Sequence, residues 1–504
     1  MFVIDVNTSF GKRVDPDPRY RAESLVDLLR SHRVGVALTH SVRGVTYDMC
    51  AGNRDTLEVC GRFPELLPAA VIDPRDEVGW RAELRRARGG GCRAIRFFPG
   101  YQGWSVDSFL FGEILEELRG SGVLCMFSLA DGQSSWEHTS RIARATADRG
   151  VPVAYTDIGY VAMAEVIAAM REYPHLYAET NWLTTIDAVE IMADRVGSGR
   201  LLFGSGAPGF PIQKSLNQVL ESALPDSDKA RILGENAAAV LRIPPDVTVG
   251  FPQVGAEPVG FDEPIIDVHS HLGHWFVTCR DEDYDPRKMI ERMSRFGIRS
   301  SVVSSYESMR YDIAAGNRAI AEAIAPHPQL LGYVEVDPYH LELSCTEMDR
   351  WFRLPNFVGV EVELTHIPCP TDSPKVSALM AELGKRGRPV LLKTHTNADA
   401  EAERRLAREN PGLPIVHAHG FDADWANVVA DTPTICVEHN LSRPSHWDIR
   451  DTIDLLGAER VLFGSDQTLL SPGAEIGLYV DAGMSPAERQ AVLHGNAERL
   501  FRIP

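Results

Sequence analysis

The segment DVHSHLG, residues 267–273, carries two histidines two positions apart. On a β-strand, side chains two residues apart point to the same face, so His269 and His271 can hold one metal ion together. Imidazole nitrogen is a common ligand of zinc and of other transition metals. The spacing therefore predicts that this strand supplies two ligands of a metal centre. The alternative interpretation is a pair of ordinary polar residues near a strand end.

A second copy of this segment lacks the histidines. Residues 5–11 read DVNTSFG, in which the aspartate, the valine and the glycine return at the same spacing. Asn7 and Ser9 stand where the later copy has His269 and His271. The strand is therefore present twice, but only one copy carries groups that suit a transition metal.

The duplication extends over the whole chain of 504 residues. At an offset of about 260 residues, YDMCAGNR (47–54) returns as YDIAAGNR (311–318), RLLFGSG (200–206) as RVLFGSD (460–466) and GENAAAVLRIP (234–244) as HGNAERLFRIP (494–504). Similar landmarks in one order indicate a duplicated domain. We predict one domain at residues 1–244, a second at 264–504, and a linker rich in proline and glycine at 245–263.

Short apolar strands alternate with helical segments within each copy. In the second copy the expected strands are 265–268, 300–305, 330–336, 357–364, 389–395, 414–419, 434–439 and 460–465. Eight strand–helix units in about 245 residues match the size of a (β/α)8 barrel. We therefore predict an α/β protein with two tandem (β/α)8 TIM-type barrels. A doubly wound open sheet is the alternative, although it would not readily use eight regular strands.

Polar residues stand at the ends of several of these strands. His395 ends the fifth expected strand, His419 ends the sixth, and Asp466 follows the eighth. Reactive groups of such a barrel lie at the carboxyl ends of its strands, so these side chains should meet His269 and His271 at one mouth. Twelve of the 16 histidines come after the predicted linker, which places the chemistry in the second domain.

The second copy resembles the amidohydrolase superfamily, in the branch that includes aminocarboxymuconate-semialdehyde decarboxylase. The matching pieces are IDVHSHLG, the GN pair after the second strand, PVLLKTH, the HG after the sixth strand, LFGSD and GNAERLF. Together they extend over nearly all of residues 264–504, whereas residues 1–244 match only in the structural parts.

The resemblance implies a ligand set of His269, His271, His395 and Asp466 around one divalent metal ion. Zinc is the first expectation, manganese or iron would also suit these ligands, and no organic cofactor is expected. Such an ion lowers the pKa of a bound water toward neutral. Asp466 would take a proton from that water as the general base, and His419 would be the acid/base group or would polarise the water.

The fourth strand departs from the pattern of the relatives. Many of them carry a lysine there in a GVKxHP-like segment, whereas this chain reads GVEVEL with Glu361 at the lysine position and Glu363 two residues later. We therefore expect no modified lysine that bridges two metal ions. A glutamate could bridge a second metal instead, and a structural salt bridge is the alternative for both residues. Tyr306 and Arg310, after the second strand, could bind an acidic substrate or could simply pack.

In the first copy every expected ligand is replaced. Asn7 and Ser9 replace the two strand-one histidines, and the remaining counterparts, with the first uncertain in register, are Ser128 for His395, Asp157 for His419 and Gly206 for Asp466. We predict a metal-free, inactive first barrel. The GN pair is kept in both copies and is therefore interpreted as structural.

Bulk composition restricts the partners. The net charge of −19 argues against nucleic acid and anionic membrane as partners. The eight cysteines include no CxxC pair, which is typical of reduced thiols in a cytoplasmic protein. We see no signal peptide and no stretch of about 18 apolar residues, so we expect a cytoplasmic protein.

These observations predict a metal-dependent hydrolase that acts with a metal-activated water on an amide, ester or lactone bond of a small molecule. One alternative is a metal-dependent non-oxidative decarboxylase of a small carboxylic acid. Another is a non-catalytic metal-binding scaffold, although a scaffold would not need His419. Relatives of this branch often pair as dimers of barrels, so we expect the two halves to form an internal pseudo-dimer, with further homo-oligomerisation open.

Overall fold

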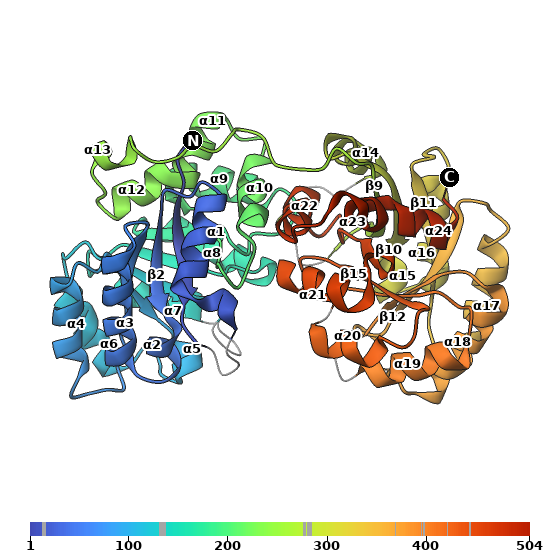
Figure 1. Cartoon of the computed structure of the whole chain (residues 1–504), viewed down its shortest axis with the longest axis horizontal. Coiled ribbons are helices and arrows are strands. Elements are labelled where there is room, and N and C mark those ends of the chain that lie inside the picture. The colour runs from blue at the N-terminus through green and yellow to red at the C-terminus, as the bar shows by residue number, and fades with distance from the viewer. Residues whose placement is uncertain are drawn as a thin grey trace. The chain divides into compact units, whose positions relative to one another are not determined.

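The computed structural model describes the chain except for residues 13–16, 131–137, 276–278, 280–284, 368, 395, 397–398, 421, 443–444 and 504. The chain divides into two compact units. The first contains Met1–Pro258, and the second contains most of the chain from Val259 onward. Each unit holds one eight-stranded parallel sheet surrounded by helices (Figure 1).

The strands of the first sheet pair in sequence order. They are β1 (Ile4–Phe10), β2 (Val36–Ser41), β3 (Leu66–Val71), β4 (Ala94–Phe97), β5 (Leu124–Ser128), β6 (Val153–Thr156), β7 (Leu176–Glu179) and β8 (Leu201–Leu202). The backbone N–H of Val6 donates to the carbonyl of Phe203 at 3.0 Å, which joins the first strand to the segment after the last. The sheet is thereby closed into a barrel.

The second sheet repeats this order. Its strands are β9 (Ile265–Leu272), β10 (Ile298–Ser305), β11 (Leu330–Val336), β12 (Phe357–Glu363), β13 (Val390–Lys393), β14 (Ile415–His417), β15 (Ile435–His439) and β16 (Val461–Phe463). The N–H of His271 donates to the carbonyl of Gln467 at 2.6 Å and closes this barrel. The predicted pair of (β/α)8 barrels is confirmed, and the open-sheet alternative is wrong because first and last strands meet.

Helices alternate with the strands in both units (Figure 1). In the first unit they are α1 (Ala22–Ser31), α2 (Val42–Thr46), α3 (Met49–Arg62), α4 (Trp80–Gly89), α5 (Pro99–Gln102), α6 (Phe109–Leu118), α7 (His138–Thr146), α8 (Tyr160–Glu172), α9 (Ala188–Val196), α10 (Ile212–Leu220), α11 (Asp226–Ala230), α12 (Asn236–Val240) and α13 (Pro245–Thr248). In the second unit they are α14 (Pro286–Arg295), α15 (Tyr306–Arg310), α16 (Ile313–Ile324), α17 (Leu341–Trp351), α18 (Pro374–Arg386), α19 (Ala400–Glu409), α20 (Ala423–Val429), α21 (His446–Leu456), α22 (Pro472–Asp481), α23 (Pro486–Gln490) and α24 (Asn496–Phe501).

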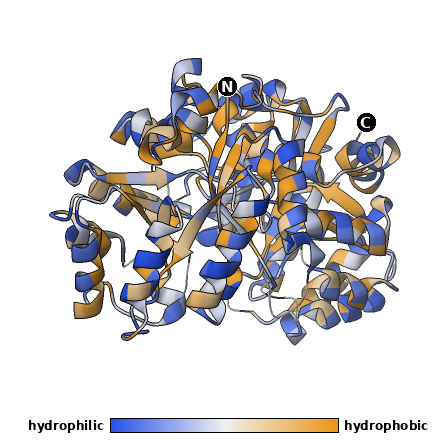
Figure 2. Ribbon diagram, turned by 60° about the vertical axis from the view of Figure 1, so that its left-hand side comes forward, coloured by the Kyte–Doolittle hydropathy of each residue, from blue (hydrophilic) through white to orange (hydrophobic). Residues whose placement is uncertain are grey.

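A break in strand pairing determines which way the first strand of each barrel points its side chains. The strands are strongly apolar, as their orange colour in Figure 2 shows. Ile266 and Val268 belong to a buried apolar cluster with residues from the other strands of the barrel. The pairing of β9 with β10 then shifts by one residue before Ser270. This bulge lets His269 and His271 point into the same barrel as Val268, although strict alternation would turn them outward.

The repeated GN pair is a clamp between a helix and the next strand. In the second barrel the side chain of Asn317 accepts from the N–H of Glu335 at 2.9 Å and donates to the carbonyl of Glu335 at 3.1 Å. Asn53 makes the same two bonds to Val71 in the first barrel, at 2.8 and 2.9 Å. A Cβ on Gly316 would collide with the backbone of Ser308, so this position requires glycine. These contacts agree with the structural interpretation of the pair.

The aspartate of the DV frame also has a structural role. Asp267 accepts from the backbone N–H of Ser465 at 3.0 Å and from its hydroxyl at 2.5 Å. Asp5 accepts from the same two groups of Ser205, at 3.1 and 2.5 Å. Each aspartate therefore ties the first strand to the segment after the last strand. This explains why the frame DVNTSFG keeps its aspartate without keeping its histidines.

Part of the predicted linker is attached to the first barrel. The N–H of Val254 donates to the carbonyl of Met1 at 2.9 Å, and the Met1 amino group donates back at 2.8 Å. The ring of Phe251 lies 6.1 Å from that of Phe2 in an edge contact. Helix α13 also lies in this segment. The predicted domain limits at residues 244 and 264 stay a prediction.

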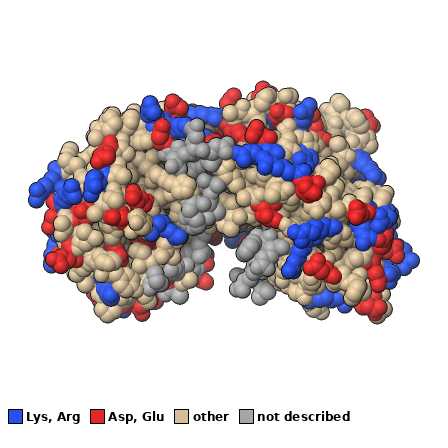
Figure 3. All heavy atoms as spheres, turned by 180° about the vertical axis from the view of Figure 1, so that it is seen from behind, with Lys and Arg blue, Asp and Glu red and all other residues tan. Residues whose placement is uncertain are grey.

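The surface carries interspersed charges. On the face shown in Figure 3, lysine and arginine alternate with aspartate and glutamate. Within the described part of the chain, every helix is too short or too polar to cross a membrane.

Candidate metal centre

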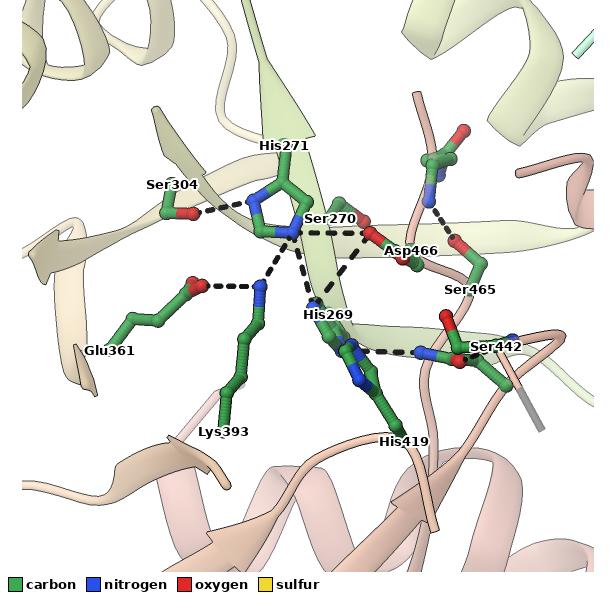
Figure 4. A network of polar contacts seen from close by, with 12 residues as sticks. His269, Ser270, His271, Ser304, Glu361, Lys393, His419, Ser442, Ser465 and Asp466 are labelled. Atoms are coloured by element: carbon green, nitrogen blue, oxygen red, sulfur yellow. Dashed lines mark hydrogen bonds and ion pairs between the residues drawn. The ribbon is translucent and has the colours of Figure 1, made fainter. Parts of the chain in front are cut away.

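Three buried side chains of the second barrel converge on one point. Nε2 of His269 lies 3.1 Å from Nε2 of His271, and Oδ1 of Asp466 lies 3.2 Å from the latter and 3.9 Å from the former (Figure 4). One ligand atom from each residue lies within 4.8 Å of the other two. Among the described residues of both barrels, this is the group of histidine and carboxylate side chains arranged to hold a metal ion.

Asp466 reaches this point because the backbone turns sharply after β16. The strand ends at Phe463, three residues earlier than Asp466. Asp466 has a left-handed backbone with φ of 52°, and its N–H donates to the carbonyl of His269 at 2.7 Å. The turn therefore fixes the carboxylate directly against the strand that carries both histidines.

His419 lies beside this group, but a turn rather than a strand positions it. Strand β14 ends at His417, and His419 follows with a left-handed φ of 71°. Its ring stacks on that of His269 with centroids 5.1 Å apart and planes 7° apart. Nε2 of His419 is buried and has no hydrogen-bond partner among the described residues. This nitrogen is therefore positioned to contact a bound ligand.

His417 does not share the face of His419, although it lies only two residues earlier in the chain. Its Nδ1 pairs with Glu403 of α19 at 3.0 Å, and its ring lies 4.6 Å from Trp425 of α20. It therefore points between the strand and its covering helices. The left-handed backbone at His419 ends the strand alternation and turns that ring inward.

His395, the fourth predicted ligand, lies outside the described residues, as does Arg443, which could bind an acidic substrate from its place after the seventh expected strand. Strand β13 ends two residues earlier, at Lys393. The assignment of His395 as a ligand therefore stays a prediction.

Lys393 is a member of the site that the sequence interpretation missed. Its buried ammonium lies 3.0 Å from Nε2 of His271, 2.7 Å from Glu361 and 3.6 Å from Glu363 (Figure 4). The pattern of the relatives places a lysine on the fourth strand, whereas this lysine comes from the fifth. The sequence signal for this lysine was the segment PVLLKTH. Side chains two residues apart on a strand share a face, so Lys393 is expected on the same face as the predicted ligand His395.

Glu361 and Glu363 both point into the barrel and pair with this lysine. Burial disfavours the charged form of Glu361, but the ammonium of Lys393 holds the pKa of this carboxyl below its usual value. The same carboxylates hold the pKa of Lys393 above its usual value against the effect of burial. The structural salt bridge weighed for these glutamates is therefore present. Neither glutamate belongs to a second metal-holding group among the described residues.

The outer nitrogens of the two strand-one histidines have partners that fix their tautomers. Nδ1 of His269 lies 2.7 Å from Oε1 of Glu438, and Nδ1 of His271 lies 2.7 Å from Oγ of Ser304. An ammonium only donates, so the contact with Lys393 requires Nε2 of His271 to be an acceptor. His271 thus carries hydrogen on Nδ1, and His269 does so when Glu438 is ionised, so that both rings then present the lone pair of Nε2 to the site.

Burial keeps the imidazoles neutral. It lowers the pKa of His271 to about 3 and lowers the pKa of His269 and of His419 well below the usual value, with Lys393 adding to each effect. Burial also raises the pKa of Glu438 to about 8. Neutral imidazole is the form that binds metals, and a nearby cation would favour ionised Glu438.

Aromatic rings form a wall beside the histidines. The ring of Tyr306 lies 4.8 Å from His271 and 5.0 Å from Trp275, which lies 5.6 Å from His366. The guanidinium of Arg310 lies 5.6 Å from the centre of the Trp275 ring. The wall offers planar apolar surface and one cation next to the convergent polar groups, as small-molecule sites do.

The first barrel contains a different polar cluster at the corresponding place. Asp157 accepts from Oγ of Ser128 at 2.7 Å and from Nδ2 of Asn7 at 3.0 Å. The buried guanidinium of Arg96 donates to Oδ1 of Asn7 at 2.7 Å. An internal cation therefore lies beside Asn7, the counterpart of His269, and the described residues offer no metal-holding group there.

The paired strands also correct one correspondence between the copies. Val71 and Glu335 are the strand residues that the two clamp asparagines bind. Val71 pairs with Arg96 of β4, and Glu335 pairs with Glu361 of β12, so Arg96 corresponds to Glu361. The next strands then align Ser128 with Lys393. Ser128 was predicted to replace His395, which lies two residues further along. That error arose because a four- or five-residue strand contains too few landmarks to fix its register.

The donor set suits a divalent transition metal. Two neutral imidazoles offer Nε2 lone pairs, and a buried carboxylate lies beside them, which is the chemistry that zinc, manganese and iron accept. Lys393 and a metal cannot share the one lone pair on Nε2 of His271. The lysine has two carboxylate partners, which can retain it when that lone pair binds an ion.

Comparison with known proteins agrees with the duplication. The Amidohydrolase family matches residues 9–243 and, separately, residues 266–503. The chain belongs to the amidohydrolase family. Both barrels are thus copies of one family domain, and the second copy holds the cluster of His269, His271 and Asp466.

The solved structures that match each correspond to about half of this chain. A dihydroxybenzoic acid decarboxylase from a Polaromonas species, with bound manganese, is 16% identical, covers 47% of this chain and 97% of its own, and has a TM-score of 0.41. A 5-carboxyvanillate decarboxylase from Novosphingobium aromaticivorans, also with manganese, is 13% identical, covers 48% of this chain and 97% of its own, and has a TM-score of 0.41. A protein described as a 2-pyrone-4,6-dicarboxylic acid hydrolase from Pseudomonas putida is 20% identical, covers 47% of this chain and 97% of its own, and has a TM-score of 0.37. No curated protein matched the chain.

Proposed function

We propose that the second barrel is a metal-dependent hydrolase that cleaves an amide, ester or lactone bond in a small molecule. The observation that carries this proposal is the convergence of His269, His271 and Asp466, with His419 stacked beside them. His395 completes the proposed ligand set. Zinc is the proposed ion, and manganese or iron suits the same donors.

A bound ion would supply Lewis-acid activation of the substrate carbonyl and of a water molecule. Asp466 would accept the proton of the attacking water, since its carboxylate is held 3.2 Å from Nε2 of His271 by the turn after β16. Neutral His419 would hold the water or the substrate through Nε2, which has no other partner among the described residues. The wall of Tyr306 and Trp275 would exclude bulk water from one side.

Decarboxylation of a small carboxylic acid is the second candidate. The exposed end of the site carries Arg310 near Trp275, and a guanidinium suits a carboxylate. Nε2 of His419 faces the same site and could deliver a proton to carbon. The same residues serve both reactions, because the fold does not select between them.

The metal proposal is tested by elemental analysis of the purified full chain. We expect one equivalent of divalent metal, and we expect His269→Ala to abolish its retention. Asn7→Ala, at the matching position of the first barrel, is the control and should leave the stoichiometry unchanged. Loss of metal from the Asn7 variant, with full retention in the His269 variant, would place the metal in the wrong barrel and refute the proposal.

The reaction is tested with panels of lactones, carboxylic esters, amides and small carboxylic acids in water enriched in oxygen-18. Hydrolysis puts the label into the product acid or carboxylate, whereas decarboxylation releases carbon dioxide. We expect label incorporation that disappears on metal removal with a chelator. Metal-dependent release of carbon dioxide would establish the second candidate instead. Bound metal with no turnover of any member would favour a scaffold.

A further inference from the structure

We propose that Glu438 is a positioning residue of the metal centre, which orients His269 as a ligand and holds His419 against it. This inference rests on the proposed metal site. It concerns a residue of β15 that belongs to none of the predicted ligands or acid/base groups. Its carboxylate is completely buried.

A single oxygen of Glu438 contacts both histidines. Oε1 lies 2.7 Å from Nδ1 of His269 and accepts the backbone N–H of His419 at 2.7 Å. The second contact has an unambiguous direction, since a backbone N–H can only donate. One carboxylate oxygen therefore links the ring of a metal ligand to the backbone of the proposed acid/base residue.

The contact with His269 determines which nitrogen faces the site. A hydrogen on Nδ1 directed at Oε1 leaves the lone pair on Nε2, the atom that lies 3.1 Å from Nε2 of His271. Carboxylates in this arrangement fix the orientation of a ligating imidazole and raise its basicity. Without Glu438, the ring of His269 could adopt the other tautomer or rotate.

The contact with His419 stabilises an unfavourable backbone. Residues with a Cβ rarely adopt a left-handed conformation, and His419 has φ of 71°. The bond from its N–H to Glu438 ties this turn to the neighbouring strand. The parallel stack of His419 on His269, with planes 7° apart, follows from anchoring both residues to one oxygen.

The first barrel repeats the arrangement without the ligands. Glu179, at the matching place on β7, accepts from the N–H of Asp157 at 3.1 Å and from Nδ2 of Asn7 at 3.3 Å. Asp157 and Asn7 correspond to His419 and His269, and Asp157 is also left-handed, with φ of 57°. The duplication therefore provides a matched control at every position.

The repeated FGS motif provides room for this carboxylate. A Cβ on Gly464 would lie under 3.0 Å from the Glu438 carboxylate, and a Cβ on Gly204 would lie under 3.0 Å from that of Glu179. An alanine at 464 would therefore displace the end of the glutamate side chain. Gly464→Ala changes the position of Glu438 without changing its chemistry, and its Cβ would also lie 3.0 Å from the Cβ of His269.

The experiment measures Zn²⁺ and Mn²⁺ affinity of the full chain by competition with a chelator of known affinity. We expect Glu438→Leu to weaken binding by about 10–100-fold. Glu438→Gln should weaken it less, because the amide oxygen can still accept both N–H groups. Gly464→Ala should weaken it as well. The controls Glu179→Leu, Glu179→Gln and Gly204→Ala should leave metal affinity unchanged, even where they lower the melting temperature as much.

Equal metal affinity in the wild type and in Glu438→Leu would overturn the inference, as would equal losses in the Glu179 variants. A wild type that binds no metal would refute the proposed metal centre, and a second readout then still decides the role of Glu438. In metal-free protein, ¹⁵N NMR of the histidine rings should show His269 with hydrogen on Nδ1, and Glu438→Leu should shift it. An unchanged tautomer would contradict the inference.

Discussion

At the scale of single residues, the carboxylate of Asp466 has two proposed roles. It would bind the metal, since Oδ1 lies 3.2 Å from Nε2 of His271, and it would accept a proton from water. The two oxygens of a carboxylate make this division feasible. Asparagine in its place keeps one oxygen for a metal but loses the charge and the basicity.

We therefore expect Asp466→Asn to lower kcat by about 10²–10⁴-fold, the usual contribution of general-base catalysis, with the fold preserved. Turnover, metal content and circular dichroism would be measured together. Asp5→Asn is unsuitable as a control because Asp5 joins the strands of the first barrel. Gly206→Asn, at the matching position, should leave turnover unchanged. A near-normal rate in Asp466→Asn would remove this residue from the mechanism.

His419 gives the complementary prediction. Its ring is stacked on His269 but is not among the three convergent groups that could hold a metal. His419→Asn should lower turnover while metal content stays near one equivalent, since asparagine tolerates the left-handed backbone. Metal analysis of the variant decides the assignment. Loss of metal would make His419 a ligand rather than an acid/base group.

At the scale of elements, the asparagine clamp joins the helix after strand two to strand three in both barrels. Asn317 satisfies the N–H and the carbonyl of Glu335, and both groups are buried. Removing the side chain leaves two buried backbone groups without partners. Each such loss costs about 1–3 kcal/mol.

We expect Asn317→Ala to lower the free energy of unfolding of the second barrel by that amount for each group. Asn53→Ala should destabilise the first barrel similarly. Arg318→Ala, on the exposed face of the same helix, is the control and should change stability by less than about 0.5 kcal/mol. Denaturation curves of the full chain measure these effects. A clamp variant as stable as the control would show that strand three needs no such support.

Arg96 is the element-scale feature that distinguishes the first barrel. Its guanidinium is buried and donates to Asn7, and Asp157, Glu179 and Asp5 provide the opposing charge. Strand four thus contributes a fixed cation to the first barrel, whereas strand five contributes Lys393 to the second. The first barrel is stabilised by its own side chain at the place where its copy would bind a metal.

Removal of this cation should destabilise the first barrel by up to about 3–5 kcal/mol, because the acidic residues around it would keep only the ammonium of Lys214 as an opposing charge. Arg96→Met keeps most of the apolar volume and should show this loss, whereas Arg96→Lys should retain part of the stability. Arg85→Met, at an exposed position, should have little effect. Thermal unfolding of the full chain would measure the change. Unchanged stability of Arg96→Met would show that the buried acids need no cation.

At the scale of the whole molecule, the first barrel keeps its complete fold although it lacks the predicted ligands. All eight strands are present in it, and its apolar residues form buried clusters of their own. A copy with no role would be free to lose these strands. We propose that the first barrel replaces the second subunit of an ancestral dimer, so that the chain is an internal pseudo-dimer.

This proposal predicts the behaviour of the separated halves. Residues 259–504 expressed alone should aggregate, self-associate or lose activity, because a partner surface would be exposed. Residues 1–258 added in trans should restore part of the activity. The cut follows Pro258 so that Phe251 and Val254 stay with the first barrel. A second half that is a stable, fully active monomer would refute the pseudo-dimer.

The sequence by itself determined the duplication, the strand order and the lopsided distribution of ligands. These features follow from local patterns: HxH on an apolar strand, repeated FGS and GN motifs, and apolar runs at regular intervals. They also gave His269, His271, His419 and Asp466 as members of one site, because parallel strands bring their carboxyl ends together. None of these inferences depends on the orientation of an individual side chain.

Only the tertiary structure decided how individual side chains are directed and paired. The bulge in β9 and the left-handed turns at His419 and Asp466 break simple alternation, so His417 faces the helices while His419 faces the site. Lys393 and Glu438 belong to the site because they contact His271 and His269, which are distant from them in sequence. Such contacts depend on strand register across the barrel, and no local pattern of residues encodes that register.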